Sequence, residues 1–439
     1  MMEAMPLILF GVLFVLLLFG FPVAFTLGGV SFILGYLTFG IDFFNLLPLR
    51  IWGVMTNYVL IAVPLFVYMG VMLEKSGLAE ELLETMALLF GKLRGGLAVS
   101  VIVVGALLGA STGIVGATVV TMGLLSLPTM LRRGYRTELA TGIISASGTL
   151  GQIIPPSIVL VLLGSILNIS IGDMFIAAVI PGLCLVGLYL IWIVIVALTR
   201  PDSAPAMPRS DLDRFVGAVR IKQTIHAFLL PGMLITAVLG SIFAGIASPT
   251  EAAAVGALGA TVLTLCKRKL SLETLKAVMA ETTHLTCMVF IILVGATAFG
   301  LVFRGLQGDA YLTRLIVEAD PGPHVFLALV MVVIFIAGFF IDFIEITFII
   351  VPVVAPIFSH LGVDLLWVGV LIAMNLQTSF LTPPFGFSLF YLKGVAPPEV
   401  RTGHIYRGII PFIVVQLIGL TLVIVFPEAA TWLPRYLAS

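Results

Sequence analysis

Long apolar segments separated by short polar loops follow one another along almost the whole chain. Counted with their flanks, about ten of them approach the roughly 20 residues that a helix needs to cross a bilayer. They cover residues 7–21, 23–37, 59–73, 139–167 and 174–198 in the first half, and 228–246, 252–266, 287–303, 368–392 and 409–426 in the second. This pattern predicts an all-α integral membrane protein with about five spans in each half.

The two halves share landmarks at one common shift of 228 residues. The coinciding pairs are Gly77 and Gly305, Pro128 and Pro356, Gly134 and Gly362, Pro155 and Pro383, and Pro156 and Pro384. Glycine and proline are common in this chain, so a single coincidence means little. Several pairs at one shift, inside matching apolar patterns, indicate an internal repeat.

Between the third and fourth span of each half lies a further apolar region, at 97–131 and at 325–358. Basic residues flank only the first of these: Lys92, Arg94, Arg132, Arg133 and Arg136. The ends of the first region therefore belong in the cytoplasm and those of the second outside, which makes the halves inverted repeats. Polar residues and glycines at 110–113 and 338–342 favour re-entrant hairpins over pairs of full spans, because polar groups at mid-depth need protein cover.

These signals divide the chain into three parts. A first inverted repeat covers 1–199, a cytoplasmic linker covers 200–222, and a second inverted repeat covers 223–439. In each repeat an amphipathic stretch precedes the hairpin, at 78–90 and at 309–319. Its mixture of charged and apolar residues favours a helix lying along the membrane surface, and the alternative is a span with a polar end.

Two of the expected spans contain a double proline near their middle. The stretches are 145–157, which reads SASGTLGQIIPPS, and 375–386, which reads NLQTSFLTPPFG. Two prolines remove two backbone donors and disfavour helical geometry before them, so each helix should unwind. Freed carbonyls suit small cations, and the N-terminus of the second half-helix, near Ser157 or Phe385, favours an anionic group. Broken helices at matching positions of inverted halves are typical of a transporter's binding site, whereas a plain proline kink is the alternative.

Asp342 and Glu345 lie at and just after the second expected hairpin tip. Ionisable residues at membrane depth are functional candidates, here for cation coordination or proton coupling. The alternatives are a water-exposed vestibule or an ion pair with an arginine such as Arg304. Glu251 stands before an apolar run and after a Ser-Pro-Thr sequence, so we interpret it as a helix-start residue.

Composition excludes most other classes of protein. Hydrophobic residues make up 60% of the chain and charged residues 10%, with a mean hydropathy of +1.22 and a formal net charge of +0. Soluble domains carry roughly 25% charged residues, and the charge balance offers nothing to a nucleic acid. The sequence has no P-loop, HExxH or Cys-x-x-Cys motif, so we do not expect an enzyme. A membrane-embedded enzyme is a remote alternative, because Asp342 lacks a second membrane aspartate as catalytic partner.

Several motifs of this chain resemble the large membrane subunit of tripartite ATP-independent periplasmic (TRAP) transporters. They are GASTG at 109–113, GTLGQIIPPS at 148–157, GFFID at 338–342, GVD at 362–364 and TPPFG at 382–386. The similarity extends over nearly the whole chain. It implies a secondary transporter of the bacterial or archaeal inner membrane with an elevator mechanism, in which hairpins and broken helices move together against a scaffold.

The resemblance also implies what the transporter works with. Sodium (Na⁺) would drive the import of an organic acid delivered by a soluble periplasmic binding protein. A small membrane subunit of four spans would accompany this chain, and because no such segment is fused here, we expect a separate partner. Membrane lipid surrounds both.

Ion sites of the family form between each hairpin tip and the neighbouring unwound loop. Carried over to this sequence, the sodium candidates are Ser111, Gly113, Gly148 and Gly151 for one ion, and Gly338, Asp342, Thr378 and Thr382 for another. The substrate candidates come from the same two unwound stretches and are Ser157, Thr149, Gln152, Asn375 and Gln377.

The stretch 375–397 departs from the commoner family pattern, notably at 377–380 and at the bulky residues 389–391. It looks like a branch often associated with 2-oxo acids, lactate or related carboxylates, which counts against a simple assignment to C4-dicarboxylates or sialic acid. Two alternatives stay open. One is a proton-coupled carrier that works through Asp342, and the other is a stand-alone sodium–carboxylate carrier that needs no receptor.

Overall fold

The computed structural model describes residues 5–113, 115–208, 217–319, 322–383 and 386–438, which form helices and connecting loops without a strand. The predicted all-α membrane fold is confirmed. Among the described residues, seven helices are long and apolar enough to cross a membrane, or eight if the bent pair 343–349 and 351–360 counts as one.

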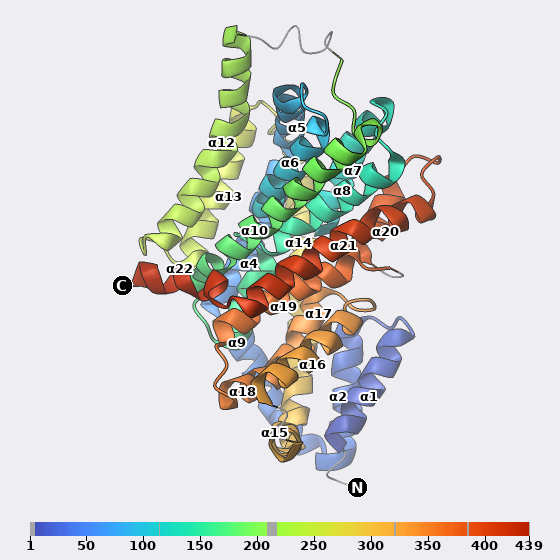
Figure 1. Cartoon of the computed structure of the whole chain (residues 1–439). Coiled ribbons are helices and arrows are strands. Elements are labelled where there is room, and N and C mark those ends of the chain that lie inside the picture. The colour runs from blue at the N-terminus through green and yellow to red at the C-terminus, as the bar shows by residue number, and fades with distance from the viewer. Residues whose placement is uncertain (1–4, 114, 209–216, 320–321, 384–385, 439) are drawn as a thin grey trace.

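The helices of the second half occur along the chain in the same order as those of the first half (Figure 1). In the first half they are α1 (Met5–Leu18), α2 (Val23–Phe39), α3 (Leu47–Met55), α4 (Ala62–Lys75), α5 (Leu78–Phe90), α6 (Gly96–Thr112), α7 (Val115–Arg132), α8 (Thr137–Thr149), α9 (Ile158–Leu167) and α10 (Ile171–Thr199), with short 3₁₀ turns η2 (Ile41–Leu46), η3 (Tyr58–Ile61) and η4 (Leu150–Gln152).

The second half has the same order of helices and one additional helix at its C-terminal end. Its helices are α12 (Gly217–Phe243), α13 (Pro249–Cys266), α14 (Leu272–Gly305), α15 (Gly308–Ala319), α16 (Gly322–Ala337), α17 (Phe343–Ile349), α18 (Val351–His360), α19 (Leu365–Leu381), α20 (Phe387–Val395), α21 (Thr402–Val425) and α22 (Glu428–Ala438). A short turn, η5 (Pro201–Ser203), stands at the start of the connection between the halves.

Six of the ten predicted spans are among these seven long helices, and the seventh, Val115–Arg132, is an arm of the first hairpin. The expected spans 139–167 and 368–392 are each divided into two shorter helices at their prolines. The first two expected spans are helices of 14 and 17 residues, shorter than the 18 residues required for this count. The expected amphipathic helices are present: α5 covers 78–90, and α15 begins one residue before the predicted 309.

Equivalent helices of the two halves exchange partners in a reciprocal way. The helix of the third expected span, α4, packs against α13, and its counterpart α14 packs against α2. In the same manner α21 packs against α8 while α10 packs against α19, and α20 packs against α7 while α9 packs against α17 and α18. An exchange of this kind is what a two-fold axis between the halves produces. The two repeats are therefore visible in the packing as well as in the sequence.

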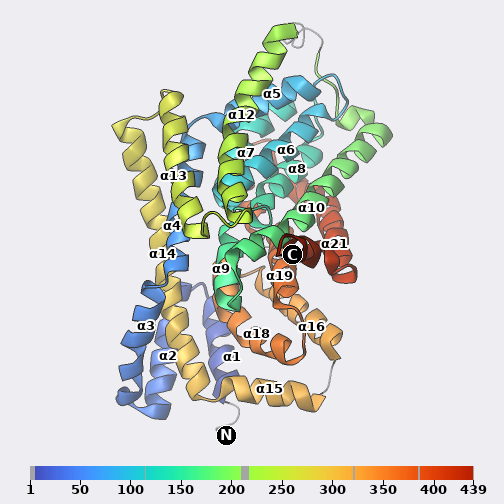
Figure 2. The same cartoon turned by 90° about the vertical axis from the view of Figure 1, so that its left-hand side faces the viewer.

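The two hairpins enter the molecule from opposite ends. Figures 1 and 2 show α5, α6 and α7 at one end and α15, α16 and α18 at the other, and in Figure 2 α15 lies across the end of α14. This is the inverted arrangement that the distribution of Lys and Arg predicts. The domain boundaries at 199, 200–222 and 223 stay a prediction, since part of the linker lies outside the described residues.

Loops that we expect in the cytoplasm meet at one end of the molecule. The backbone N–H of Arg136 donates to the Ser203 carbonyl at 3.1 Å, and that of Gly95 donates to the Ala204 carbonyl at 2.9 Å. Lys267, after α13, forms an ion pair with Glu81 of α5. The start of the linker thus packs against both ends of the first hairpin, and the loop after α13 pairs with α5 at the same end.

Glycines allow the first hairpin to lie directly on the first broken helix. A Cβ atom added to Gly109 would lie 2.6 Å from the backbone nitrogen of Gly151, and one added to Gly105 would lie 2.6 Å from the Ser147 Cβ. A Cβ added to Gly148 would lie 2.3 Å from Val119 of α7. Side chains cannot approach so closely, so both arms of the hairpin depend on glycine for their contact with α8 and η4.

We expect Gly109→Ala to destabilise the protein and to impair transport. The added methyl group would collide with backbone at Gly151, and overpacking of this kind costs about 1–3 kcal/mol. The melting temperature of the purified protein should fall by several degrees. Gly187→Ala is the matched control because no atom lies within 4 Å of its added Cβ. Equal melting temperatures of the two variants would contradict this close packing.

Candidate functional site

Both double-proline stretches interrupt their helices. After α8 the chain makes the 3₁₀ turn η4, leaves helical geometry from Ile153 to Ser157, and resumes as α9 at Ile158. At the second double-proline stretch, α19 ends at Leu381, Thr382 has extended backbone, and α20 begins at Phe387. Pro384 and Phe385 lie outside the described residues. The predicted unwinding is confirmed, and the alternative of a continuous, merely kinked helix is wrong.

The hairpin tips are also found where the glycine and polar residues predict them. The first arm, α6, ends at Thr112, and Gly113 terminates it with a positive φ of 62°. The second hairpin leaves helical geometry from Gly338 to Asp342. There Asp342 and Glu345 form a capping box: the Asp342 carboxylate accepts from the Phe343 N–H at 2.7 Å, and Glu345 accepts from the Asp342 N–H at 2.9 Å. This box fixes the direction in which α17 starts.

A cavity of about 100 Å³ lies where the tips, the breaks and the helices α4 and α14 meet. Residues from the first half line it at Val67 of α4, Val115 and Gly116 of α7, and Ile158 of α9; residues from the second half line it at Leu285, Met288 and Val289 of α14, Asp342, Phe343 and Ile344 of the second tip, Phe380 of α19, and Phe387 and Tyr391 of α20. We call this space the central cavity. Its described lining is apolar except for Asp342 and Tyr391.

Two of the lining residues have a special position, because each begins a half-helix after a break. Ile158 is the first residue of α9, and Phe387 is the first residue of α20. The N-terminus of a helix carries unpaired N–H groups and a partial positive charge. Two such ends at one cavity favour a negatively charged ligand.

The first set of sodium candidates lies along one contact between the hairpin and the broken helix. A Cβ on Gly113 would lie 3.3 Å from the Ile158 nitrogen, while Gly151 faces Gly109 and Gly148 faces Val119. The side chain of Ser111 lies outside the described residues. The backbone of the tip therefore meets the break, but the three glycines face different neighbours rather than one point.

The second set of sodium candidates lies along the contact between the second hairpin tip and α19. Gly338 presses against Ser379 of α19, whose Oγ lies 2.1 Å from the position of an added Cβ. The hydroxyls of Thr378 and Thr382 donate to carbonyls one turn earlier, at 2.9 Å and 2.8 Å. Asp342 faces the central cavity. Within the described part of the chain no cluster of three His, Cys, Asp or Glu side chains that could hold a metal ion exists, so a sodium ion here would need carbonyl and hydroxyl oxygens besides the Asp342 carboxylate.

The five substrate candidates are buried but do not line the central cavity. The Ser157 hydroxyl donates to the Gln152 carbonyl at 2.7 Å, and the Asn375 amide donates to the Met331 carbonyl at 2.7 Å. The Gln377 amide donates to the Thr149 hydroxyl at 3.3 Å. Their role as substrate ligands stays a prediction.

Comparison with known proteins decides the family. The model of the family "Tripartite ATP-independent periplasmic transporter, DctM component" matches residues 10–429.

The chain belongs to this family. The resemblance seen in the motifs is thereby confirmed, as is an integral, multi-pass membrane location. The family name describes a transporter of three parts, of which the DctM component is one.

Curated relatives cover this DctM-family chain almost completely. The C4-dicarboxylate TRAP transporter large permease protein DctM of Pseudomonas aeruginosa is 33% identical over 93% of this chain and 94% of the relative. The ectoine TRAP transporter large permease protein TeaC of Halomonas elongata is 32% identical, over 95% and 96%. The sialic acid TRAP transporter large permease protein SiaM of Vibrio cholerae is 31% identical, over 96% of both. These relatives are permeases, not enzymes, and their names carry three different substrates.

A solved structure supports the fold. The Alcanivorax borkumensis YdaH transporter, described as having an unusual topology, matches with a TM-score of 0.63 and 15% sequence identity, over 93% of this chain and 96% of that one. At this identity the likeness concerns the fold alone.

A buried polar cluster of the permease was missed by sequence reasoning. Tyr189 of α10 and Gln416 of α21 meet Gln377, and the Tyr189 hydroxyl faces both amides. All three are almost completely buried, and among the described residues neither amide group of Gln416, nor the Gln377 Oε1, nor the Tyr189 hydroxyl has a hydrogen bond of good geometry. Single polar residues within apolar spans are the only signal of this cluster in the sequence, and they carry no information about which helices meet.

Gln377 and Thr149 lie 228 residues apart, which is the shift that relates the two halves. Equivalent positions of two repeats can touch only on the axis that relates them. Their hydrogen bond therefore marks the internal two-fold axis, at a point where both broken helices meet.

We expect Gln377→Leu to reduce transport without lowering the melting temperature. Leucine removes a buried, unpaired carbonyl oxygen, whose burial costs about 1–3 kcal/mol, and gives up only one long hydrogen bond. A polar group kept at such a cost points to a working role, so uptake should fall by about fivefold or more, a loss of about 1 kcal/mol. The exposed Gln223→Leu of α12 is the control. A large fall in melting temperature for Gln377→Leu would show a purely structural role.

Proposed function

We propose that this chain is the large permease of a sodium-driven importer of an organic acid. The observation that carries the proposal is the meeting of two broken helices and two hairpin tips at one central cavity. Unwound backbone supplies carbonyl oxygens for a small hard cation, and helix N-termini favour a carboxylate. Broken helices in two inverted repeats are the arrangement that secondary transporters use to bind both.

The two kinds of ligand would occupy neighbouring places. Sodium would bind where each tip contacts its break, near Gly113 with Gly151 and near Gly338 with Thr382. The carboxylate would bind in the central cavity, between the first residues of α9 and α20. The apolar and aromatic part of the lining, including Phe343 and Tyr391, suits the carbon skeleton of a small acid. This supports a 2-oxo acid, lactate or related carboxylate.

The partners of this permease follow from its family. The DctM component is one of three parts, and we propose a separate four-span membrane subunit and a soluble periplasmic receptor as the other two. Delivery by a receptor also explains how relatives of similar sequence carry names with different substrates, since the receptor then selects the substrate.

An elevator movement fits the packing of the chain. The reciprocal pairs of α4 with α13 and of α14 with α2 would form the scaffold. The hairpins, the broken helices and the last span of each half would move as one body, since α8 packs against α6, α7 and α21. The central cavity lies at the border between these two bodies, where Met288 of α14 and Asp342 of the second tip both line it.

Proton coupling is the second candidate, because Asp342 is the one carboxylate in the described lining of the central cavity. A carboxylate at this place could exchange a proton during each transport cycle. Sodium coupling is preferred because the two breaks offer a binding place in each half, whereas Asp342 has no acidic counterpart at the first tip.

Uptake by the reconstituted complex tests the coupling ion. Proteoliposomes that contain this chain, its small subunit and the loaded receptor should accumulate a labelled carboxylate only with an inward sodium gradient. Equal uptake in potassium would overturn the sodium part of the proposal, and dependence on a pH gradient would then favour proton coupling. Equal uptake without the receptor would favour a stand-alone carrier.

Asp342→Asn separates the charge of this residue from its role as a helix cap. Asparagine caps helices about as well as aspartate, so α17 should keep its start and the melting temperature should change little. We expect uptake to fall by about tenfold or more, which is about 1.4 kcal/mol. The matched control is Asp364→Asn, because Asp364 caps α19 by accepting from the Leu366 N–H at 2.9 Å and does not line the cavity. Wild-type uptake by Asp342→Asn would leave only the capping role.

A further inference from the structure

A second hollow of about 160 Å³ lies between α8, α10 and α21. It shares no lining residue with the central cavity. We call it the basic groove, because Arg136, Arg200 and Arg407 line it together with a single carboxylate, that of Glu138. The groove belongs to the end of the molecule where the basic loops meet, which the distribution of Lys and Arg assigns to the cytoplasm.

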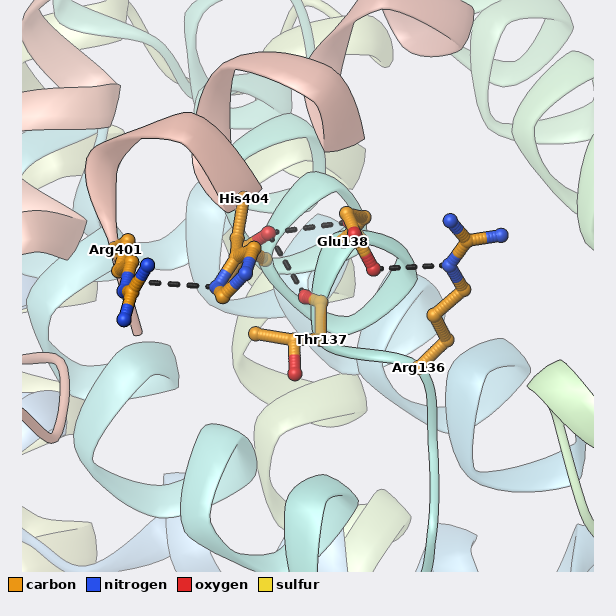
Figure 3. A network of polar contacts seen from close by, with 6 residues as sticks. Arg136, Thr137, Glu138, Arg401 and His404 are labelled. Carbon is orange, nitrogen blue, oxygen red and sulfur yellow. Dashed lines mark hydrogen bonds and ion pairs between the residues drawn. The ribbon is translucent and has the colours of Figure 1, made fainter. Parts of the chain in front are cut away.

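Glu138 offsets only one of the three positive charges. Its carboxylate accepts from the Arg136 Nε at 2.9 Å, and Figure 3 shows the two terminal nitrogens of Arg136 pointing away from that carboxylate. Burial raises the pKa of Glu138, but hydrogen bonds from its own backbone and from Arg136 outweigh this and lower the pKa below its ordinary value. Among the described residues no carboxylate pairs with Arg200 or Arg407. The groove therefore keeps an excess of positive charge.

The helices that carry these charges are held firmly together. The Thr141 hydroxyl of α8 lies 2.9 Å and 3.1 Å from the carbonyls of Thr137 and Glu138. On the other side, a Cβ on Gly408 of α21 would lie 2.0 Å from the same Glu138 carbonyl. The start of the broken helix α8 and the start of the last span α21 are therefore in close backbone contact beside the arginines.

Apart from Ser203 and Gly408, the rest of the described groove lining carries large apolar side chains. Leu139, Trp192, Val196, Pro411 and Phe412 line it below the arginines. Exposed apolar side chains continue from it along both spans, including Leu198 of α10 and Ile410 of α21. The Trp192 indole nitrogen is buried and has no hydrogen-bond partner within the described residues, and tryptophan is typical of the membrane–water interface.

We propose that the basic groove binds the phosphate headgroup of an anionic phospholipid of the cytoplasmic leaflet. The guanidinium forks of Arg200, Arg407 and the outer nitrogens of Arg136 match phosphate oxygens. Basic pockets between spans on the cytoplasmic side are typical sites for such headgroups. The apolar wall around Trp192 takes the acyl chains, which a free phosphate ion would leave unused. A lipid bound here joins the first half of a broken helix to the last spans of both repeats.

Lipid retention by the purified full-length chain tests the proposal. Vesicles of phosphatidylglycerol should raise its melting temperature and leave lipid bound in native mass spectra, whereas vesicles of phosphatidylcholine should not. In the double variant Arg200→Gln/Arg407→Gln the affinity for phosphatidylglycerol should fall by about 25-fold, from about fivefold per arginine near the membrane surface. Arg94→Gln is the matched control, because Arg94 is exposed on a basic loop of the same end but does not line the groove. Equal retention by the double variant and the control would overturn the proposal.

A second readout reports the position of the lipid. Phosphatidylglycerol with brominated acyl chains should quench part of the tryptophan fluorescence of the wild-type chain, and Trp192→Phe should remove that part. If the double variant does not fold, Arg407→Lys replaces it, since lysine keeps the charge but loses the fork, and it should weaken binding by a smaller factor. Stabilisation by inorganic phosphate alone, equal to that by phosphatidylglycerol, would also overturn the lipid assignment, as would unquenched Trp192.

Discussion

Unwound backbone in a membrane protein must find its hydrogen-bond partners inside the protein, and the rest of this structure depends on that constraint. The chain leaves helical geometry after Leu150–Gln152 and again after Leu381, at depths where lipid offers no partner. Each break is therefore covered by a helical hairpin that ends close to it. In the first half this cover is possible only because Gly109, Gly148 and Gly151 remove the side chains that would separate the two backbones.

The same constraint explains why the central cavity belongs to neither half alone. A half-helix that starts after a break presents its N-terminus inward, and the two-fold relation brings the starts of α9 and α20 to a common cavity. The hydrogen bond between Gln377 and Thr149, at equivalent positions of the repeats, lies on the axis of that relation. Helices α4 and α14 close the cavity from the side, so its contents lie between these helices and the hairpins and breaks. Under the proposed elevator movement, this border is where one body would carry a solute past the other.

Much of the fold could be read from residues that restrict the backbone. Prolines at 155–156 and 383–384 remove donors, so the breaks follow from covalent structure, and glycine with polar residues at 110–113 and 338–342 predicts the tips for a similar reason. The candidate site was less predictable. Asp342 was identified because a charge at membrane depth is costly, and it does line the cavity. Tyr391 and Phe343 line it as well, but an aromatic residue in an apolar span resembles any core residue, so nothing in the sequence distinguishes them.

The sequence by itself determined that the chain lies in a membrane, that it contains a repeat with broken helices and hairpins, and which family it resembles. Each of these conclusions follows from local chemistry: the length of the apolar segments, the geometry of proline and glycine, and the ordered motifs. Only the tertiary structure decided which helices meet. Tyr189, Gln377 and Gln416 come from three distant segments, as do the arginines of the basic groove at 136, 200 and 407. Contacts of this kind are set by the two-fold packing of one half on the other, a long-range relation that periodicity and composition do not encode.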